Sequence, residues 1–189
     1  LITSSAASDV YKRQELIKPT KMEVNVEESN GKVGILSAEP LERGFGLTLG
    51  NAIRRILLSS LQGAAITSIK IKGVVHEFST IQGVKEDLTD ILLNLKSVAV
   101  KVHSPGLKKM YLKSSGSGEL RAGNFETDSE TEIMNPDQLI MTLDSNADVE
   151  IEANVETGKG YVSAEVAEDE NKVIGEIKLD AMFSPCLLY

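Results

Sequence analysis

Histidine, cysteine and carboxylate side chains are the groups in this sequence that could support acid–base, nucleophilic or metal chemistry. The chain has two histidines, His76 and His103, and one cysteine, Cys186, and none of them has a partner at metal-ligand spacing. His76 precedes Glu77, but adjacent residues of a strand point to opposite faces, which separates this pair. The carboxylates between positions 119 and 170 alternate along predicted strands as a solvated face. The sequence therefore favours structural or interface histidines, and we expect no catalysis, cofactor or metal.

Three glycines, Gly44, Gly46 and Gly50, have the spacing GxGxxxG at the start of a predicted helix. This spacing is one residue longer than the dinucleotide fingerprint GxGxxG, and the Lys-Ser/Thr pair of a P-loop is absent. The free N–H groups of a helix N-terminus can nevertheless bind phosphate. One alternative function is therefore an acidic α+β domain that binds a ligand or phosphate at residues 44–50.

The helix that follows these glycines has two distinct faces within residues 39–62. At an advance of about 100° per residue, one face forms an apolar stripe of Leu49, Ala52, Ile53, Ile56, Leu57 and Ser60. Leu58 projects away from this stripe and is flanked by Arg54 and Arg55. Arginine is favoured at interfaces because its planar fork makes several directed hydrogen bonds. The stripe predicts packing on a core or partner, and the opposite face predicts a second interface. The plainer alternative is a generic dimeric domain whose Leu58 face is solvated.

Bulk composition restricts the class of protein. The 189 residues can form one domain or two small ones, and 41% hydrophobic with 4% aromatic content predicts an aliphatic core. A net charge of -8 counts against a nucleic-acid binder, which needs a basic surface. A single cysteine fits a reducing compartment. We find no apolar run of the roughly 20 residues that cross a bilayer and no secretory signal in the first residues, so a cytoplasmic protein without membrane contact is predicted.

The first half of the chain predicts a hairpin, a helix, a strand pair and a second helix. Period-two alternation predicts strands on either side of a turn at residues 29–31 within 20–36. The first helix is expected to be capped by Thr48 and to run to about residue 61. Residues 65–78 predict a strand, a turn or bulge at Gly73, and a second strand. Helical spacing then spans residues 84–96, with Glu86 and Asp87 in the first turn, Lys96 in the last, and Leu93 off the apolar stripe.

From residue 98 onward the pattern is almost entirely β. Alternation at 98–102, 110–112 and 149–155 predicts strands, separated by turns at 114–118, 135–137 and 157–161. Residues 164–172 are acidic and polar and predict a loop, and 174–181 predict a last strand. The sum is an α+β protein with two helices and many antiparallel strands.

Two long stretches of this sequence are similar to a known family. They read PLERGFGLTLGNAIRRILLSSLQGAAITSIKIKGV and HEFSTIQGVKEDLTDILLNLK, and the shorter pieces GKGYV and LDAMFSP follow in the same order. Over residues 15–185 the chain closely resembles the amino-terminal domain of the bacterial RNA polymerase alpha subunit. That resemblance implies a non-catalytic scaffold in DNA-directed RNA polymerase, a nucleotidyltransferase complex. It would form an alpha homodimer, recruit the beta and beta-prime subunits, and work in the bacterial cytoplasm or, as a family alternative, in plastids.

The resemblance also implies domains and contact residues. A dimerisation subdomain would comprise residues 15–62 and 173–185, with a mostly antiparallel β subdomain, residues 63–172, inserted between them. The first helix would use Phe45, Leu49, Ile53 and Ile56 in core and dimer packing. Docking of beta would involve Arg54, Arg55 and Leu58, and docking of beta-prime would involve Lys96 and Leu179.

The ends of the chain depart from the family pattern. Residues 1–14 and 186–189 predict no element, and we interpret them as non-native flanks of a fragment. After Pro185 the family continues with a further dimerisation helix, a linker and a carboxy-terminal domain that contacts promoter DNA. The resemblance therefore assigns no direct DNA binding to this chain, and the apolar stripe of the first helix is expected to be incompletely covered.

Overall fold

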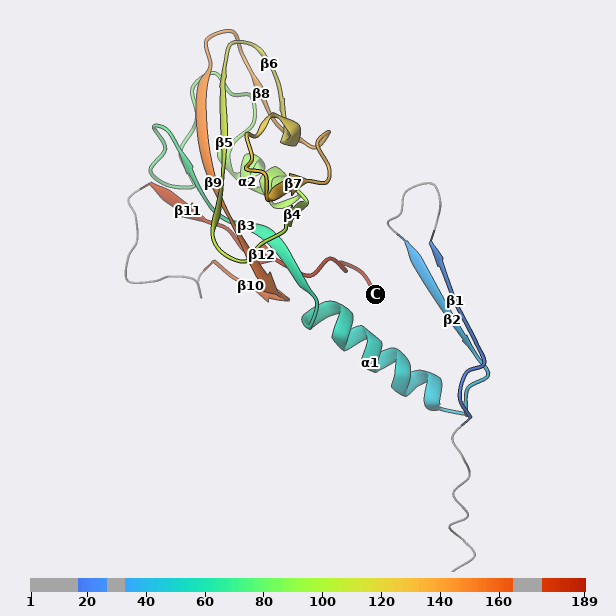
Figure 1. Ribbon diagram of the computed structural model, residues 1–189. Coiled ribbons are helices and arrows are strands. Elements are labelled where there is room, and N and C mark those ends of the chain that lie inside the picture. Colours follow the sequence, from blue (N-terminus) through green and yellow to red (C-terminus); the bar gives the residue numbers. More distant parts are fainter. Residues whose placement is uncertain (1–16, 27–32, 165–174) are drawn as a thin grey trace, which may run out of the picture. The chain divides into compact units, whose positions relative to one another are not determined.

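The computed structural model describes residues 17–26, 33–164 and 175–189 of the chain. The chain divides into two compact units, residues 1–53 and 54–189, with the boundary inside the first helix (Figure 1). Each unit has its own local architecture.

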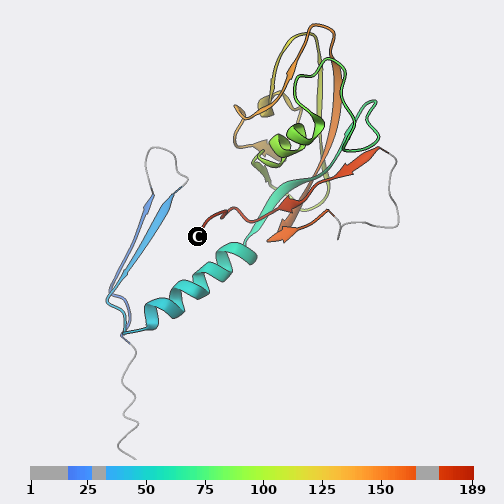
Figure 2. The ribbon, with the colours of Figure 1, turned by 180° about the vertical axis from the view of Figure 1, so that it is seen from behind.

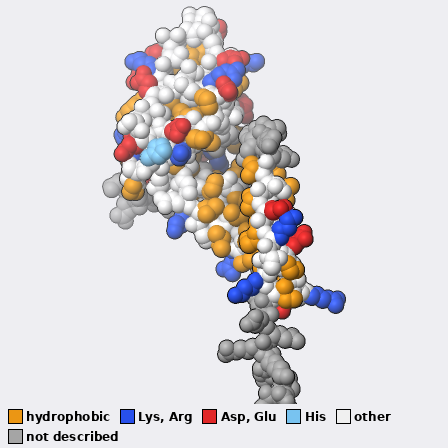
Figure 3. All heavy atoms as spheres, turned by 45° about the vertical axis from the view of Figure 1, so that its right-hand side comes forward, with side chains coloured by type: hydrophobic (Ala, Val, Ile, Leu, Met, Phe, Trp, Pro, Cys, Tyr) orange, Lys and Arg blue, Asp and Glu red, His pale blue; other side chains and the backbone are white. Residues whose placement is uncertain are grey.

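In the first unit, strands β1 (Lys21–Val26) and β2 (Gly34–Glu39) pair in antiparallel register, which confirms the predicted hairpin. The predicted turn at 29–31 lies outside the described residues. Val24 is opposite Leu36, whereas Ile35 is opposite Asn25. Because directly opposed residues share a face, Leu36 and not Ile35 lies on the face of Val24. Both faces of the hairpin therefore expose apolar side chains. Figure 3 shows apolar side chains along the side of the hairpin that is in view.

Helix α1 (Phe45–Ser59) begins earlier and ends earlier than the periodicity predicts. Gly44 has a φ of 86°, a conformation open to glycine, and the Phe45 N–H donates to the Glu42 carbonyl, so the turn closes directly before the helix. Thr48 consequently lies within the first turn, and the predicted Thr48 cap is wrong. The helix ends at Ser59, and β3 begins three residues later.

An antiparallel sheet forms the centre of the second unit, with strand order β5-β9-β3-β4-β7 and β11 also paired to β3. Its strands are β3 (Gln62–Ile71), β4 (Val100–Val102), β5 (Lys108–Ser115), β7 (Thr131–Ile133), β9 (Asp148–Lys159) and β11 (Glu176–Lys178). Alternate residues of β9 are buried, as its sequence predicts. Figure 2 shows helix α2 (Leu88–Lys96) in front of this sheet, and its buried residues are Leu88, Ile91 and Leu95.

Two smaller strand pairs complete the second unit. Strands β6 (Gly118–Arg121) and β8 (Leu139–Leu143) pair with each other, as do β10 (Tyr161–Val162) and β12 (Ala181–Met182), and a short 3-10 turn spans Ala122–Asn124. The core is aliphatic, as predicted; its largest fully buried side chains are Ile69, Ile71, Leu88, Ile91, Leu95, Met110, Leu112, Ile140, Met141, Ile151, Val149 and Val155. The fold is α+β with an inserted β subdomain.

Local patterns mispredicted three elements of this unit. No strand follows Gly73: the Val74 N–H closes a turn on the Ile71 carbonyl, and Phe78 is 82% exposed. The predicted last strand is two short strands, β11 and β12, because each pairs with a different partner. Glu86 precedes α2 instead of lying in its first turn, since its carboxylate accepts hydrogen bonds from Thr142 on β8.

Candidate subunit-docking surfaces

The arginine face of α1, defined by Arg54, Arg55 and Leu58, lies in the second unit. Both arginines are exposed and Leu58 is half-buried. The Ser184 hydroxyl donates to the Leu57 carbonyl at 2.7 Å, so the segment after β12 is anchored to the end of the helix. A half-buried leucine beside two exposed guanidinium groups matches the composition of a protein interface.

The residues predicted for core and dimer packing are incompletely covered. Phe45, Leu49 and Ile53 are half-buried, Ile56 is 53% exposed, and α1 contributes no fully buried residue. Leu58 is therefore better covered than Ile56, although the sequence predicts the reverse. The cause is local, since the end of α1 packs near Gly160 and Ser184.

The glycine spacing of residues 44–50 does not form a loop. Gly46 and Gly50 lie inside α1, and Gly44 alone precedes it. A phosphate loop cradles its ligand with consecutive N–H groups of an irregular loop, whereas residues 45–50 are helical here and the Phe45 N–H donates to the Glu42 carbonyl.

Lys96 and Leu179, 83 positions apart in sequence, are brought together through Asp180. The Lys96 Nζ donates to Asp180 Oδ2 at 2.8 Å, and the Ala164 N–H donates to Oδ1 at 3.0 Å. The hydrogen bond from Lys96, then that from Ala164, and one from the Tyr161 hydroxyl hold the pKa of the Asp180 carboxyl below its ordinary value. Leu179 is 6% exposed, and its N–H donates to the Thr67 carbonyl. Lys96 is thus presented at the surface, whereas Leu179 packs in the core behind it.

The segment from Leu179 to Ser184 connects this cluster with the end of α1. Phe183 lies within this segment. Its ring packs against Gly158 and its carbonyl lies against Gly63, and a β-carbon at either glycine would collide with Phe183. The Phe183 N–H donates to the Gly160 carbonyl at 2.8 Å. One short strand-like segment therefore contacts both candidate surfaces.

Comparison with protein families decides the class of this molecule. The family model described as the RNA polymerase Rpb3/RpoA insert domain matches residues 69–184, more than half of the chain. The chain belongs to this family. The resemblance to RNA polymerase alpha is confirmed, and the chain carries a domain of an alpha-type polymerase subunit. The match includes Lys96 and Leu179, and it begins after α1.

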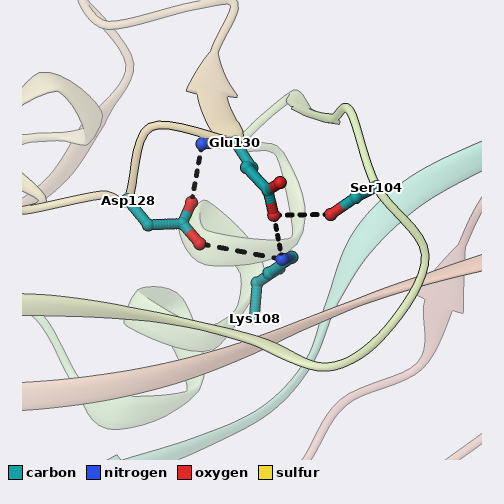
Figure 4. A network of polar contacts seen from close by, with 4 residues as sticks. All are labelled: Ser104, Lys108, Asp128 and Glu130. Carbon is teal, nitrogen blue, oxygen red and sulfur yellow. Dashed lines mark hydrogen bonds and ion pairs between the residues drawn. The ribbon is translucent and has the colours of Figure 1, made fainter.

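A polar network in this alpha-type subunit joins the loop after β4 to the start of β7 (Figure 4). Glu130 accepts a hydrogen bond from the Lys108 ammonium and another from the Ser104 hydroxyl at 2.5 Å, while Asp128 lies 3.9 Å from Lys108. The hydrogen bond to Glu130 raises the pKa of Lys108, and the bonds from Lys108 and Ser104 lower the pKa of Glu130. The bonds from Ser104 and Lys108 to one carboxylate connect the loop after β4 to the residue before β7.

An open groove of about 550 Å³ lies where β3 and β4 separate beyond their single paired position, Ala64 with Val100. His103 lines it, and His103 Nε2 is 3.8 Å from Glu132. His76 instead contacts the Ser79 hydroxyl in an exposed turn, 3.2 Å away. Within residues 17–26, 33–164 and 175–189, no group of three or more metal-ligating side chains occurs and no helix is long and apolar enough to span a membrane.

Sequence reasoning missed Asp180 as the partner of Lys96, and it missed the contact of Asp180 with Tyr161. Tyr161 and Asp180 occur in the motifs GKGYV and LDAMFSP, but nothing in their local pattern indicates that they converge. Only the pairing of β10 with β12 and the Lys96–Asp180 bond bring them together.

Proposed function

We propose that this chain is the assembly subunit of a DNA-directed RNA polymerase, which forms an alpha homodimer and binds the beta and beta-prime subunits without performing chemistry itself. The observation that supports this most strongly is α1, which presents an exposed arginine pair on one face and an incompletely covered apolar stripe on the other. A helix with two such faces is suited to two partners. The proposed setting is the bacterial cytoplasm or a plastid.

Beta is proposed to dock on Arg54, Arg55 and Leu58. Exposed guanidinium groups can pair with carboxylates of a partner, and Leu58 supplies an apolar centre between them. Loss of an arginine that is buried on binding costs roughly 2–5 kcal/mol, because the partner charges are left unpaired.

The test is co-purification of beta with the subunit carrying Arg55→Ala or Leu58→Asp. We expect both variants to fold and to lose beta, while Arg43→Ala, an exposed arginine just before α1, retains it. Unchanged recovery of beta with both variants would refute the assignment of this site.

Beta-prime is proposed to dock around Lys96. Leu179 supports this surface from the core, since its side chain is buried and its neighbour Asp180 holds the lysine. Lys96→Ala is expected to weaken beta-prime binding directly. Leu179→Ala is expected to do so only in proportion to the stability that it removes.

Homodimerisation is proposed to cover the apolar stripe through Phe45, Leu49, Ile53 and Ile56, within a dimerisation subdomain of residues 15–62 and 173–185. The 53% exposure of Ile56 supports the requirement for a partner. Size-exclusion chromatography with light scattering is expected to find a dimer that Ile56→Glu converts to a monomer. An unmodified chain that is monomeric at every concentration would contradict the dimer.

A further inference from the structure

The groove between β3 and β4 has the dimensions of a small-molecule site. The two strands pair at one position only, Ala64 with Val100, and the open space beside that position measures about 550 Å³. Ligand sites in proteins commonly enclose roughly 300–1,000 Å³ and are lined by apolar side chains with a few polar groups. Val102, Pro105 and Pro185 supply the apolar wall here.

The polar part of the wall carries positive charge. Lys101 and His103 are two positions apart on β4, so they lie on one face of the strand, and both are exposed. Both line the groove, and Thr157 joins them from β9. None of the described residues that line the groove is acidic, although the whole chain has 28 acidic and 20 basic residues. The groove therefore differs in charge from the rest of this acidic protein.

Carboxylates approach these residues from the other side of β4. In the sheet, β4 separates β3 from β7, and Glu132 on β7 lies 3.8 Å from His103 Nε2. Glu132 is also directly opposite Lys101, yet among the described residues no ion pair includes Lys101. The Lys101 ammonium at the groove is thus left without a carboxylate partner, while Glu132 restrains the imidazole beside it.

The charges on the two sides of β4 select a class of ligand. An unpaired ammonium and an imidazole attract an anion, and the apolar wall favours a ligand with a carbon body. A dianion such as a phosphate monoester would bring a second negative charge toward Glu132 and Glu130, which would repel it. A single negative charge matches the single unpaired ammonium.

We propose that the groove between β3 and β4 binds a small organic carboxylate. Lys101 pairs with the carboxylate, and His103 and Thr157 donate hydrogen bonds to it. Val102 and Pro185 contact the carbon body of the ligand. The groove shares no residue with the candidate docking surfaces, so this inference does not rest on the proposed function.

The test uses 4-phenylbutyrate, a carboxylate on a short apolar body, titrated into the isotopically labelled full chain. We expect saturable NMR shifts of the amides that line the groove, such as those of Gly63, Val102 and Ser104. A dissociation constant on the order of 1 mM is expected for a ligand of this size. Shifts confined to other parts of the chain, or no saturable shift, would refute the site.

Two further probes separate the charge of the ligand from its body. The neutral 4-phenylbutyramide has the same body, and acetate has the same charge without the body. Each is expected to bind at least several-fold more weakly than 4-phenylbutyrate. Equal affinity for the amide would refute recognition of a carboxylate, and equal affinity for acetate would refute the role of the apolar wall.

A variant with a matched control tests the ion pair. Lys101→Gln is expected to weaken 4-phenylbutyrate binding about three- to fivefold, the range of an exposed ion pair, and to leave binding of the amide unchanged. Lys113→Gln is the control, because Lys113 is an exposed strand lysine on β5 that does not line the groove. Unchanged amide shifts away from the groove verify that both variants are folded. Equal affinity of the two variants for 4-phenylbutyrate would refute the role of Lys101.

Discussion

The ring of Phe183 lies directly against the α-carbon of Gly158: a β-carbon at position 158 would be 2.7 Å from two ring carbons. Gly158 is near the end of β9, and Phe183 directly follows β12, so this contact closes the C-terminal segment on the central sheet. The absence of a side chain at position 158 is what allows this approach.

Gly158→Ala is therefore expected to destabilise the second unit by about 1–3 kcal/mol, the usual cost of overpacking. Urea unfolding monitored by circular dichroism measures the change. In a Phe183→Ala background the same substitution should cost almost nothing, because the colliding ring is gone. An equal cost in both backgrounds would show that the contact is not the cause.

The pairing of Lys96 with Asp180 predicts a pH-dependent contribution to stability. The pKa of the Asp180 carboxyl is held below its ordinary value of 3.8, so its contribution is present above pH 3.8 and is lost as pH falls through the lower folded value. Asp180→Asn should cost no more than about 1 kcal/mol at pH 7, since the pair is partly exposed. The difference between wild type and variant should vanish in strong acid. Asp137→Asn, at an exposed turn, serves as the control, and a pH-independent difference would contradict the linkage.

The contact of Glu86 with Thr142 predicts a measurable change in a carboxyl pKa. Burial by itself raises the pKa of Glu86, but hydrogen bonds from the N–H and the hydroxyl of Thr142, at 2.7 and 2.8 Å, outweigh it and lower the pKa below 4.5. Thr142→Val removes one donor, so NMR titration should find a higher pKa and denaturation a loss of about 1 kcal/mol. Thr127→Val, at an exposed position, should change neither. An unshifted Glu86 titration in Thr142→Val would count against the hydroxyl bond.

The network of Ser104, Lys108 and Glu130 predicts local order in the loop after β4. Glu130→Gln removes the charge that holds Lys108, so the backbone amides of Ser104 and of residues 106–108 should exchange faster with deuterium. The wild-type loop should also loosen below pH 4.5, as Glu130 is protonated through its lowered pKa, and above pH 10.5, as Lys108 loses its proton. The control is Lys113→Met, because Lys113 also lies on β5 but its side chain is 69% exposed. Exchange that is equally slow in the Glu130 variant would show that other contacts order this loop.

Local sequence patterns predicted correctly those helices and strands that bury one face in the core. The alternation of residues 149–155 appears as buried and exposed positions of β9, and the spacing of Leu88, Ile91 and Leu95 appears as the buried face of α2. The same reasoning failed after Gly73, where Val74 is buried but Val75 and Phe78 are exposed and no strand forms. Among the residues that the structure describes, no strand pairs with this segment, so its strand propensity is not realised.

The sequence predicted some features of the candidate docking residues and not others. Arg54 and Arg55 are exposed on α1, as helical spacing predicts, and their role in binding beta stays a prediction. Lys96 ends α2 as expected, but its bond to Asp180 crosses 84 positions of sequence. No pattern within either segment encodes that contact.

The sequence by itself determined the α+β class, the two helices, the aliphatic core and the relationship to RNA polymerase alpha, because apolar periodicity and long motifs are properties of contiguous residues. Only the tertiary structure showed that Leu179 is buried while Lys96 lies at the surface. It also showed that Phe183 packs against Gly158, and that Tyr161 and Met182 lie on the same face of the β10–β12 pair. These relationships depend on which strands pair and in which register, and the pairing free energy comes from contacts between segments far apart in the chain.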